Sequence, residues 1–171
     1  MCTTAIKDGD AYVLNGSKTF ITSAPYAGVF VVWAVPDKEA PRGKGISTFL
    51  IEAGTPGLTI GKEEHKMGQN ASATNELIFD NCRVPASAMM GKPNDGFRIA
   101  VAELAGGRIG IGSLGLGIGL AAMDHATRYA ADRQQFCQKI SNFQAIQWMI
   151  ADSYTELEAA RPLLMNAAFR K

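Results

Sequence analysis

The sequence contains few of the side chains that usually form metal centres or disulfide frameworks. Its three cysteines, Cys2, Cys82 and Cys137, are far apart and form no C-x-x-C pair. Its two histidines, His65 and His125, show no metal-ligand spacing with cysteine or carboxylate side chains. We therefore expect no metal site and no disulfide scaffold. This cysteine usage favours a reducing compartment, and we predict a cytoplasmic location.

The sequence also has no excess of charge of either sign. It has 17 Lys and Arg residues against 16 Asp and Glu residues, a formal net charge of +1. Neither nucleic acid nor a membrane is therefore an expected partner. The nearest candidate for a membrane span, Ile109 to Met123, is too short and too rich in glycine. With 47% hydrophobic residues the chain can bury a core, and its 171 residues allow one or two domains.

The N-terminal half of the chain is predicted to be rich in β-structure. Short runs of β-branched and aromatic residues alternate with turn signals such as Gly54-Thr55-Pro56-Gly57 and Asn70-Ala71-Ser72. This spacing is typical of an antiparallel barrel or sandwich. The expected strands are Phe30–Val35, Ser47–Ile51, Leu58–Ile60 and Glu76–Val84.

Asn15-Gly16 is a strong two-residue turn signal. Both central residues of a type I′ turn need positive φ, which asparagine and glycine tolerate. The flanking runs Ala11–Leu14 and Lys18–Thr22 are therefore predicted to be the strands of a hairpin.

The second strand of this hairpin carries an aromatic-x-hydroxyl triplet. Alternation along a strand would place Phe20 and Thr22 on one face and Ile21 on the other. A phenyl face beside a hydroxyl can contact a planar heterocycle and hydrogen-bond one of its ring atoms. The alternative is a half-buried strand with one polar residue.

From Asp95 onward the apolar residues recur at helical intervals. Two long helices are predicted. Ser141-Asn142-Phe143-Gln144 is a capping-box pattern, so we place the N-cap of the second helix at Ser141. Pro162 lies inside the second pattern, where a proline costs about 3 kcal/mol and is expected to kink or break the helix.

The first helical segment contains a glycine motif that has two interpretations. Gly110, Gly112 and Gly115 fit the pattern G-x-G-x-x-G, which binds a dinucleotide when it follows a strand. No alternation of strand, helix and strand surrounds the motif. We therefore favour close packing of a long helix against its neighbours. Since two helices cannot enclose a core, we also expect further helices or a second copy of the chain.

An ordered series of motifs resembles the acyl-CoA dehydrogenase family, although it covers only the middle of a family member. The motifs are Asn15-Gly16 with Lys18 and Phe20-Ile21-Thr22, then Lys66-Met67-Gly68, Ser72 to Pro85, Gly96-Phe97, Gly106-Gly107-Arg108 and Asp132-Arg133-Gln134-Gln135-Phe136. The resemblance implies an α+β fold, in which an antiparallel β-barrel or sandwich domain is followed by the long helices of an incomplete four-helix bundle. Residues 1–92 would be the middle β-domain and residues 93–171 the first two helices of the C-terminal domain.

The resemblance implies FAD as the cofactor, with Phe20, Ile21 and Thr22 beside the flavin ring. The Thr22 hydroxyl would lie near the nitrogen that accepts hydride. Phe20 stands where the family usually has tryptophan, which keeps an aromatic face but loses an N–H donor.

A second group, Arg133, Gln135, Phe136 and Gln144, would bind the adenine dinucleotide half of FAD across a subunit interface. Arginine suits a pyrophosphate because its planar fork donates paired hydrogen bonds, and a phenyl ring suits stacking on adenine. Without the resemblance, a surface ion pair for Arg133 and only a capping role for Gln144 would be the ordinary interpretation.

Ser23, Leu104 and Arg108 would contact the acyl-CoA substrate by the same resemblance. In most relatives the base that removes the substrate's α-proton is a glutamate late in the C-terminal domain. A minority have it immediately before the helix arginine, where this chain has Gly107. Glu103 lies five residues before Arg108 and therefore on another helix face. The catalytic residues thus remain unknown.

The function implied is that of a flavoprotein oxidoreductase of fatty acid metabolism, which catalyses α,β-dehydrogenation of an acyl-CoA thioester. The family commonly forms homo-oligomers, as tetramers or dimers, and electron-transfer flavoprotein is the expected electron acceptor. As a fragment of such an enzyme, the chain is expected to be inactive alone. A non-catalytic oligomerisation or binding module and an acyl-CoA oxidase-like enzyme are the alternatives.

Overall fold

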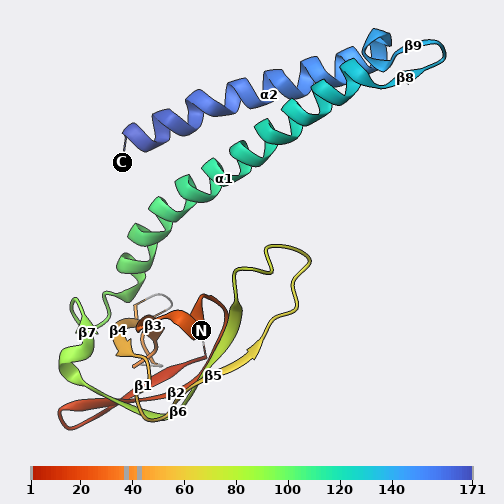
Figure 1. Cartoon of the computed structure of the whole chain (residues 1–171). Coiled ribbons are helices and arrows are strands. Elements are labelled where there is room, and N and C mark those ends of the chain that lie inside the picture. The colour runs from red at the N-terminus through yellow and green to blue at the C-terminus, as the bar shows by residue number, and fades with distance from the viewer. Residues whose placement is uncertain (1, 37–38, 42–43, 171) are drawn as a thin grey trace. The chain divides into compact units, whose positions relative to one another are not determined.

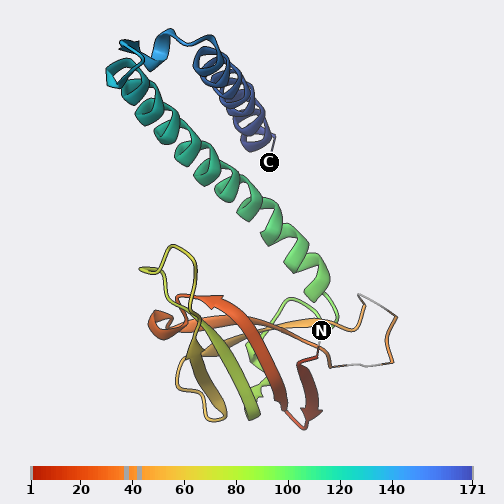
Figure 2. The same ribbon diagram turned by 90° about the vertical axis from the view of Figure 1, so that its right-hand side faces the viewer.

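The computed structural model describes residues 2–36, 39–41 and 44–170. The chain divides into two compact units, one that extends to Val101 and one that begins at Ala102. The first consists mainly of antiparallel sheets, and the second consists of two long helices joined by a small hairpin (Figures 1 and 2). This organisation confirms the predicted α+β class.

The first unit contains two antiparallel sheets. The larger sheet has the strand order β1-β2-β6-β5 and the smaller has the order β3-β4-β7. The strands of the larger sheet are β1 Thr4–Asp8, β2 Ala11–Thr22, β5 Leu58–Glu63 and β6 Thr74–Pro85. The strands of the smaller sheet are β3 Val29–Ala34, β4 Ser47–Glu52 and β7 Met89–Met90. Short 3-10 turns follow β2 at Ala24–Tyr26 and β6 at Ala86–Ala88. A parallel bridge between Thr4 and Val35 links the two sheets.

Among the described residues, the core of this unit is one cluster of side chains from both sheets. Leu14 of β2 and Leu77 of β6 belong to the larger sheet, Phe49 and Ile51 of β4 belong to the smaller one, and all four are almost fully buried. The rings of Tyr12 and Phe49 lie 5.1 Å apart between centroids and bridge the sheets. The predicted sandwich is therefore confirmed, while no closed barrel forms in the described part of the chain.

The predicted hairpin at Asn15-Gly16 is wrong. β2 continues through both residues, and the turn that precedes it is Gly9-Asp10, after β1. Gly16 has a φ of 130° and lies at a β-bulge, where the register against β6 shifts after Leu14. A Cβ atom there would lie 2.9 Å from the Cα of Thr3. The same tolerance of positive φ that suits a turn here serves a bulge at a close backbone approach.

The four other predicted strands are confirmed as β3, β4, β5 and β6, with ends displaced by a few residues. The largest differences are at β5, which continues to Glu63, and at β6, which begins at Thr74. Strand ends are set by pairing with a partner strand, and the local sequence carries little information about that pairing.

The second unit contains the two predicted helices. α1 spans Gly96–Asp132, with its first turns in the first unit, and α2 spans Gln144–Phe169. Between them lie the strands β8 Gln134–Gln135 and β9 Gln138–Lys139 and the 3-10 turn Ile140–Asn142. The G-x-G-x-x-G motif lies in the middle of α1, where it cannot form a phosphate-binding loop at a helix N-terminus.

The start of α2 differs from the prediction. Its N-cap is Phe143, without a capping side chain, because Ser141 belongs to the preceding 3-10 turn. The carbonyl of Phe143 accepts hydrogen bonds from the N–H groups of Ile146 and Gln147, at 3.0 and 3.1 Å. The predicted N-cap at Ser141 is therefore wrong. Pro162 lies inside α2 without breaking it, so the expected break does not occur.

The two helices run antiparallel and side by side (Figures 1 and 2). Glycines of α1 lie at contacts between them. A Cβ atom at Gly112 would lie 2.9 Å from Cδ1 of Leu164, and one at Gly119 would lie 2.7 Å from Cδ2 of Leu157. Close packing is thus confirmed for these two glycines. Gly115, by contrast, faces open space.

Replacing Gly119 by leucine is expected to destabilise the helical unit, and Gly115→Leu is its matched control. The gain in helix propensity, about 0.8 kcal/mol, is the same at both sites. Only the side chain at position 119 must displace Leu157, which costs about 1–3 kcal/mol. Urea unfolding followed by helix circular dichroism measures the difference. Equal effects of the two substitutions would show that the helices do not pack through Gly119.

Most of the apolar surface of the helical unit is exposed. Among its described hydrophobic residues only Ala130 is buried, whereas many large side chains are exposed, including Ile111, Ile118, Trp148 and Leu163. By length, and by a mean hydropathy of 1.3 over an 18-residue stretch, α1 could also cross a membrane. The same composition suits a helix inside a helical bundle, and the contacts with α2 are of that kind.

Candidate cofactor site

The end of β2 forms a second bulge around Phe20. Between Lys18 and Ile21 the register against β6 shifts by one residue, and Phe20 has a left-handed φ of 59°. Simple alternation therefore does not determine where the side chains of this segment lie, and the placement of Phe20 and Thr22 on one face stays a prediction. The Phe20 side chain is 71% exposed, and Ile21 is half-buried. The bulge thus presents a large aromatic side chain to solvent.

The residues after the bulge are held against the start of β6. Thr22 is opposite Thr74 in the strand pair, and the N–H of Ser23 donates a hydrogen bond of 2.8 Å to the carbonyl of Ala73. Ser23 is also left-handed, with a φ of 59°. A left-handed non-glycine residue costs about 1–2 kcal/mol, and such strain concentrates at ligand sites. The Thr22 hydroxyl is in an exposed residue and forms no hydrogen bond with the described residues.

A lysine organises the loop that leads into β6. The ammonium of Lys66 donates hydrogen bonds to the carbonyl of Gln69 and the hydroxyl of Thr74, both at 3.0 Å, and to the carbonyl of Ser72. The sequence shows the motif Lys66-Met67-Gly68, but nothing in it identifies these acceptors. Sequence reasoning therefore missed this contribution to the site.

Two further polar groups lie in this strand pair. Lys18 is half-buried, and burial lowers the pKa of its ammonium, while the nearby Cys2 acts in the opposite direction. Asn75, opposite Ile21, is 5% exposed and donates a hydrogen bond of 3.1 Å to the carbonyl of Gly61. Its Oδ1 atom is buried without a hydrogen-bond partner among the described residues. That atom can accept a hydrogen bond from a buried water molecule.

The β8–β9 hairpin presents the second group of predicted residues. Phe136 and Cys137 form its two-residue turn, with φ values of 52° and 62°. This is the backbone pattern that had been predicted for Asn15-Gly16. The Phe136 ring is 84% exposed and meets the ring of Phe143 edge-on, with centroids 6.1 Å apart. The turn therefore holds an aromatic ring out in solvent.

Arg133 lies at the base of this hairpin. Its N–H group donates to the carbonyl of Tyr129 and its carbonyl accepts from the N–H of Ile140, which fixes its backbone. Its exposed guanidinium forms no ion pair with any described residue, so the surface ion pair considered above is not formed. Gln135 is in β8, and Gln144 is the first residue of α2. The structure thus brings the four residues into one hairpin and the adjoining helix start.

The predicted substrate residues are divided between the two units. Ser23 belongs to the first unit, whereas Leu104 and Arg108 are exposed on α1 in the second. Leu104 and Arg108 are spaced i, i+4 and therefore share a helix face. Gly107 and Glu103 are also in α1.

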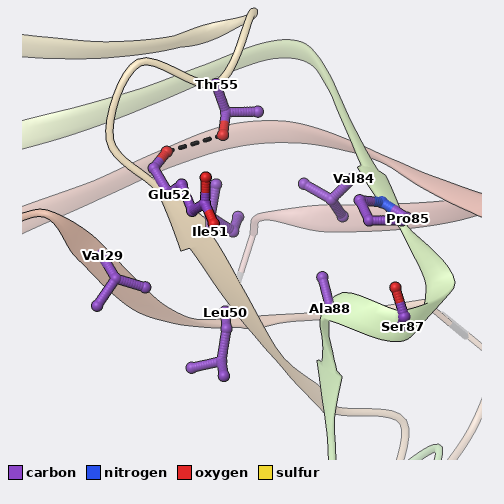
Figure 3. A pocket seen from close by; sticks show the side chains of 9 residues that line it. All are labelled: Val29, Leu50, Ile51, Glu52, Thr55, Val84, Pro85, Ser87 and Ala88. Atoms are coloured by element: carbon purple, nitrogen blue, oxygen red, sulfur yellow. Dashed lines mark hydrogen bonds between the residues drawn. The ribbon is translucent and has the colours of Figure 1, made fainter.

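A cavity in the first unit is distinct from these residues. Figure 3 shows its lining, which is Val29, Leu50, Ile51, Glu52, Thr55, Val84, Pro85, Ser87 and Ala88. None of these was predicted as a site residue. The described residues also contain no group of three or more His, Cys, Asp or Glu side chains that could hold a metal ion.

The exposed groups suit a large planar cofactor with an anionic tail. An unpaired guanidinium beside an exposed phenyl ring can bind a pyrophosphate and stack on a base. An exposed phenyl ring near a free hydroxyl can cover a flat heterocycle and hydrogen-bond its edge. The side chains present therefore fit FAD.

Comparison with known proteins gives two family matches. Residues 1–82 match the middle domain of acyl-CoA dehydrogenases, and residues 94–171 match the acyl-CoA dehydrogenase C-terminal domain. The predicted domain boundary between residues 92 and 93 falls in the gap between the two matches and stays a prediction.

Individual relatives agree with these matches. An acyl-CoA dehydrogenase of Bacillus subtilis (strain 168) is 48% identical over 166 residues, which are 97% of this chain and 44% of that protein. The structure of butyryl-CoA dehydrogenase from Megasphaera elsdenii matches with a TM-score of 0.93 and 44% identity, over 98% of this chain and 44% of the other. A structure described as the electron transferring flavoprotein of Acidaminococcus fermentans gives a TM-score of 0.92, 48% identity and the same coverage. The chain thus spans less than half of these relatives.

Proposed function

The chain belongs to the acyl-CoA dehydrogenase family, and we propose that it supplies the FAD site of an enzyme that dehydrogenates acyl-CoA thioesters. In this reaction the substrate loses a proton from its α-carbon and a hydride from its β-carbon, and a double bond forms between them. FAD, when bound, accepts the hydride. The base that takes the proton is not among the site residues described above.

The observation that carries this proposal is the exposed bulge at Phe20 next to Thr22. Because the phenyl group of Phe20 is 71% exposed, a flat ring can cover it directly, and the burial of this apolar surface contributes to binding. The free hydroxyl of Thr22 can donate a hydrogen bond to a ring atom of the flavin. These residues would bind and orient the ring. The pairing of Thr22 with Thr74 and the hydrogen bond from Ser23 to Ala73 hold this strained segment in place.

The dinucleotide half of FAD is assigned to Arg133, Gln135, Phe136 and Gln144. Arg133 would hold the pyrophosphate through paired hydrogen bonds, and Phe136 would stack on adenine. We further propose that these residues come from a second copy of the chain. The exposed apolar faces of α1 and α2 support self-association, because two helices alone cannot bury them.

The proposed substrate is an acyl-CoA, with Ser23, Leu104 and Arg108 as candidate contacts. Electron-transfer flavoprotein is the proposed electron acceptor, and the relative described by that name in Acidaminococcus fermentans supports this partner. Cys2, Cys82 and Cys137 are free thiols, in keeping with the proposed cytoplasmic location.

The exposed helix faces also support a second candidate function, a non-catalytic oligomerisation module. The two functions differ in their need for a cofactor. Light scattering combined with an FAD titration of the purified chain distinguishes them. Association that neither needs nor binds FAD would favour the second function.

A chimera tests the proposed enzyme directly. The 171-residue chain replaces the matched 166-residue segment of the Bacillus subtilis relative, which supplies the remaining parts. We expect the purified chimera to retain FAD and its visible absorbance to bleach when an acyl-CoA is added without oxygen. A Thr22→Val variant should bleach about tenfold more slowly, the effect of one hydrogen bond of about 1.4 kcal/mol.

The matched control is Thr55→Val, which removes a hydroxyl from the cavity of Figure 3. It should leave the rate of bleaching unchanged. A chimera that folds but retains no FAD, or whose FAD is not bleached by any acyl-CoA, would contradict the proposal. Peroxide formation in air with fast turnover would instead identify an oxidase.

A further inference from the structure

We infer that Lys66 is a positioning residue, whose ammonium closes the loop between β5 and β6 and thereby holds the Thr22–Ser23 segment in place. Its hydrogen bonds all go to residues of that loop or to the first residue of β6. The link to FAD binding rests on the proposed function, whereas the mechanical link does not.

All three N–H donors of the Lys66 ammonium form hydrogen bonds. A lysine side chain has three N–H donors and no acceptor. Lys66 directs these donors to three oxygen atoms, in the carbonyls of Gln69 and Ser72 and the hydroxyl of Thr74. A half-buried lysine with every donor used acts as a cross-link within the loop. Hydrogen bonds from a charged donor are stronger than neutral ones.

The loop that Lys66 cross-links contacts the end of β2 directly. The carbonyl of Ser72, which Lys66 holds, immediately precedes Ala73, whose carbonyl accepts the N–H of Ser23 at 2.8 Å. Thr74, which Lys66 also holds, is paired with Thr22. Two contacts therefore connect the cross-linked loop to the strand end. The N–H of Glu64 bonds to the Thr74 carbonyl at 2.8 Å and closes the loop from the β5 side.

Lys62, four residues before Lys66, forms no comparable hydrogen bonds with the described residues. Lys62 is exposed on β5 and forms no hydrogen bond or ion pair with the described residues. Both lysines carry one charge, four residues apart in sequence. A difference between their variants therefore reports on the hydrogen bonds of Lys66 and not on local charge.

Amide hydrogen exchange of the 171-residue chain tests the mechanical link. In Lys66→Met, exchange at Ser23 and Ser72 should accelerate at least tenfold, while exchange at the core residues Leu77 and Phe49 stays unchanged. Lys66→Arg should restore most of the protection, because it keeps a charged donor. Lys62→Met should change nothing. Unchanged exchange at Ser23 in Lys66→Met would overturn the inference.

A variant with a smaller perturbation covers the case in which Lys66→Met unfolds the sheet. Thr74→Val removes one of the three acceptors and keeps the shape of the side chain. It should accelerate exchange at Ser23 severalfold without affecting Leu77 or Phe49. If both Thr74→Val and Lys66→Met accelerate amide exchange at Ser23, Leu77 and Phe49 alike, the hydrogen bonds of Lys66 support only the general stability of the sheet. That result would overturn the inference.

The chimera supplies the readout that links Lys66 to the cofactor. Lys66→Met should weaken FAD binding about tenfold and alter the visible circular dichroism of the bound flavin, with KM for acyl-CoA unchanged. Failure of the unsubstituted chimera to bind FAD would contradict the proposed function alone, since the exchange result would still decide the role of Lys66. Normal FAD binding and an unaltered flavin spectrum in Lys66→Met would overturn the positioning role.

Discussion

Replacing Arg133 by alanine is expected to weaken FAD binding to the chimera about 100-fold. The guanidinium is exposed and free of ion pairs with the described residues, so its five N–H donors are available to a pyrophosphate. A charge-assisted hydrogen bond contributes about 1.5–3 kcal/mol, so losing two at the lower end of this range removes about 3 kcal/mol, which corresponds to about 100-fold in affinity. Arg133→Lys keeps the charge but loses the planar fork, and should bind FAD about tenfold more weakly. Fluorescence titration of the apoprotein measures both.

Arg128→Ala, near the C-terminal end of α1, is the matched control. Its guanidinium forms an exposed i, i+4 ion pair with Asp124, at 2.7 Å, and such pairs contribute about 0.3–0.5 kcal/mol. FAD affinity should therefore be unchanged. Equal losses in Arg128→Ala and Arg133→Ala would indicate a general effect of positive charge, and no loss in Arg133→Ala would remove Arg133 from the site.

The same variant tests the proposal that each site combines residues from two copies. Arg133→Ala subunits would be mixed with Phe20→Ala subunits and allowed to exchange. If the two groups belong to different copies, one kind of mixed site has both groups intact, and strong FAD binding reappears. If both groups belong to one chain, every site in the mixture keeps a defect.

Replacing Phe49 by alanine is expected to destabilise the β-unit by about 3–5 kcal/mol. Phe49 is fully buried and contacts the ring of Tyr12 across the two sheets, so its removal leaves a cavity in the core that the two sheets share. Urea unfolding measures the loss. Trp33 is in β3 and Trp148 is in α2, so a Trp148→Phe background leaves one tryptophan, in the β-unit, whose fluorescence reports on that unit.

Phe20→Ala is the counterpart of this variant in the same unit. Because Phe20 is 71% exposed, the free energy of unfolding should change by less than about 1 kcal/mol. FAD binding should weaken about tenfold, since stacking contacts contribute about 0.5–1.5 kcal/mol beyond the area they bury. The account fails here if Phe20→Ala unfolds the sheet, or if Phe49→Ala is no less stable than Phe20→Ala.

Much of the fold follows from local patterns, and each error has a physical origin. Short β-branched runs and helical periodicity identified β3 to β6, α1 and α2 correctly. Asn15-Gly16 was misinterpreted as a turn because only pairing with distant strands distinguishes a turn from a bulge. Ser141 was misinterpreted as an N-cap because a 3-10 turn, which the motif does not encode, precedes α2.

The site was predicted from motifs for some residues and missed for others. Phe20, Thr22, Arg133 and Phe136 stand in motifs of the family, and the structure gives them exposed positions. The role of Lys66 could not be predicted, because its acceptors are two carbonyls and a hydroxyl that only the folded loop brings together. Every residue has a backbone carbonyl, so the amino-acid sequence does not reveal which carbonyl accepts a hydrogen bond from a side chain.

A crystal structure of the FAD-loaded chimera tests the central claim most directly. The account predicts the flavin ring against Phe20 with one ring atom within hydrogen-bond distance of the Thr22 hydroxyl. It also predicts the pyrophosphate on the guanidinium of Arg133 from a second copy. FAD bound away from both groups, or no FAD in a correctly folded protein, would contradict it.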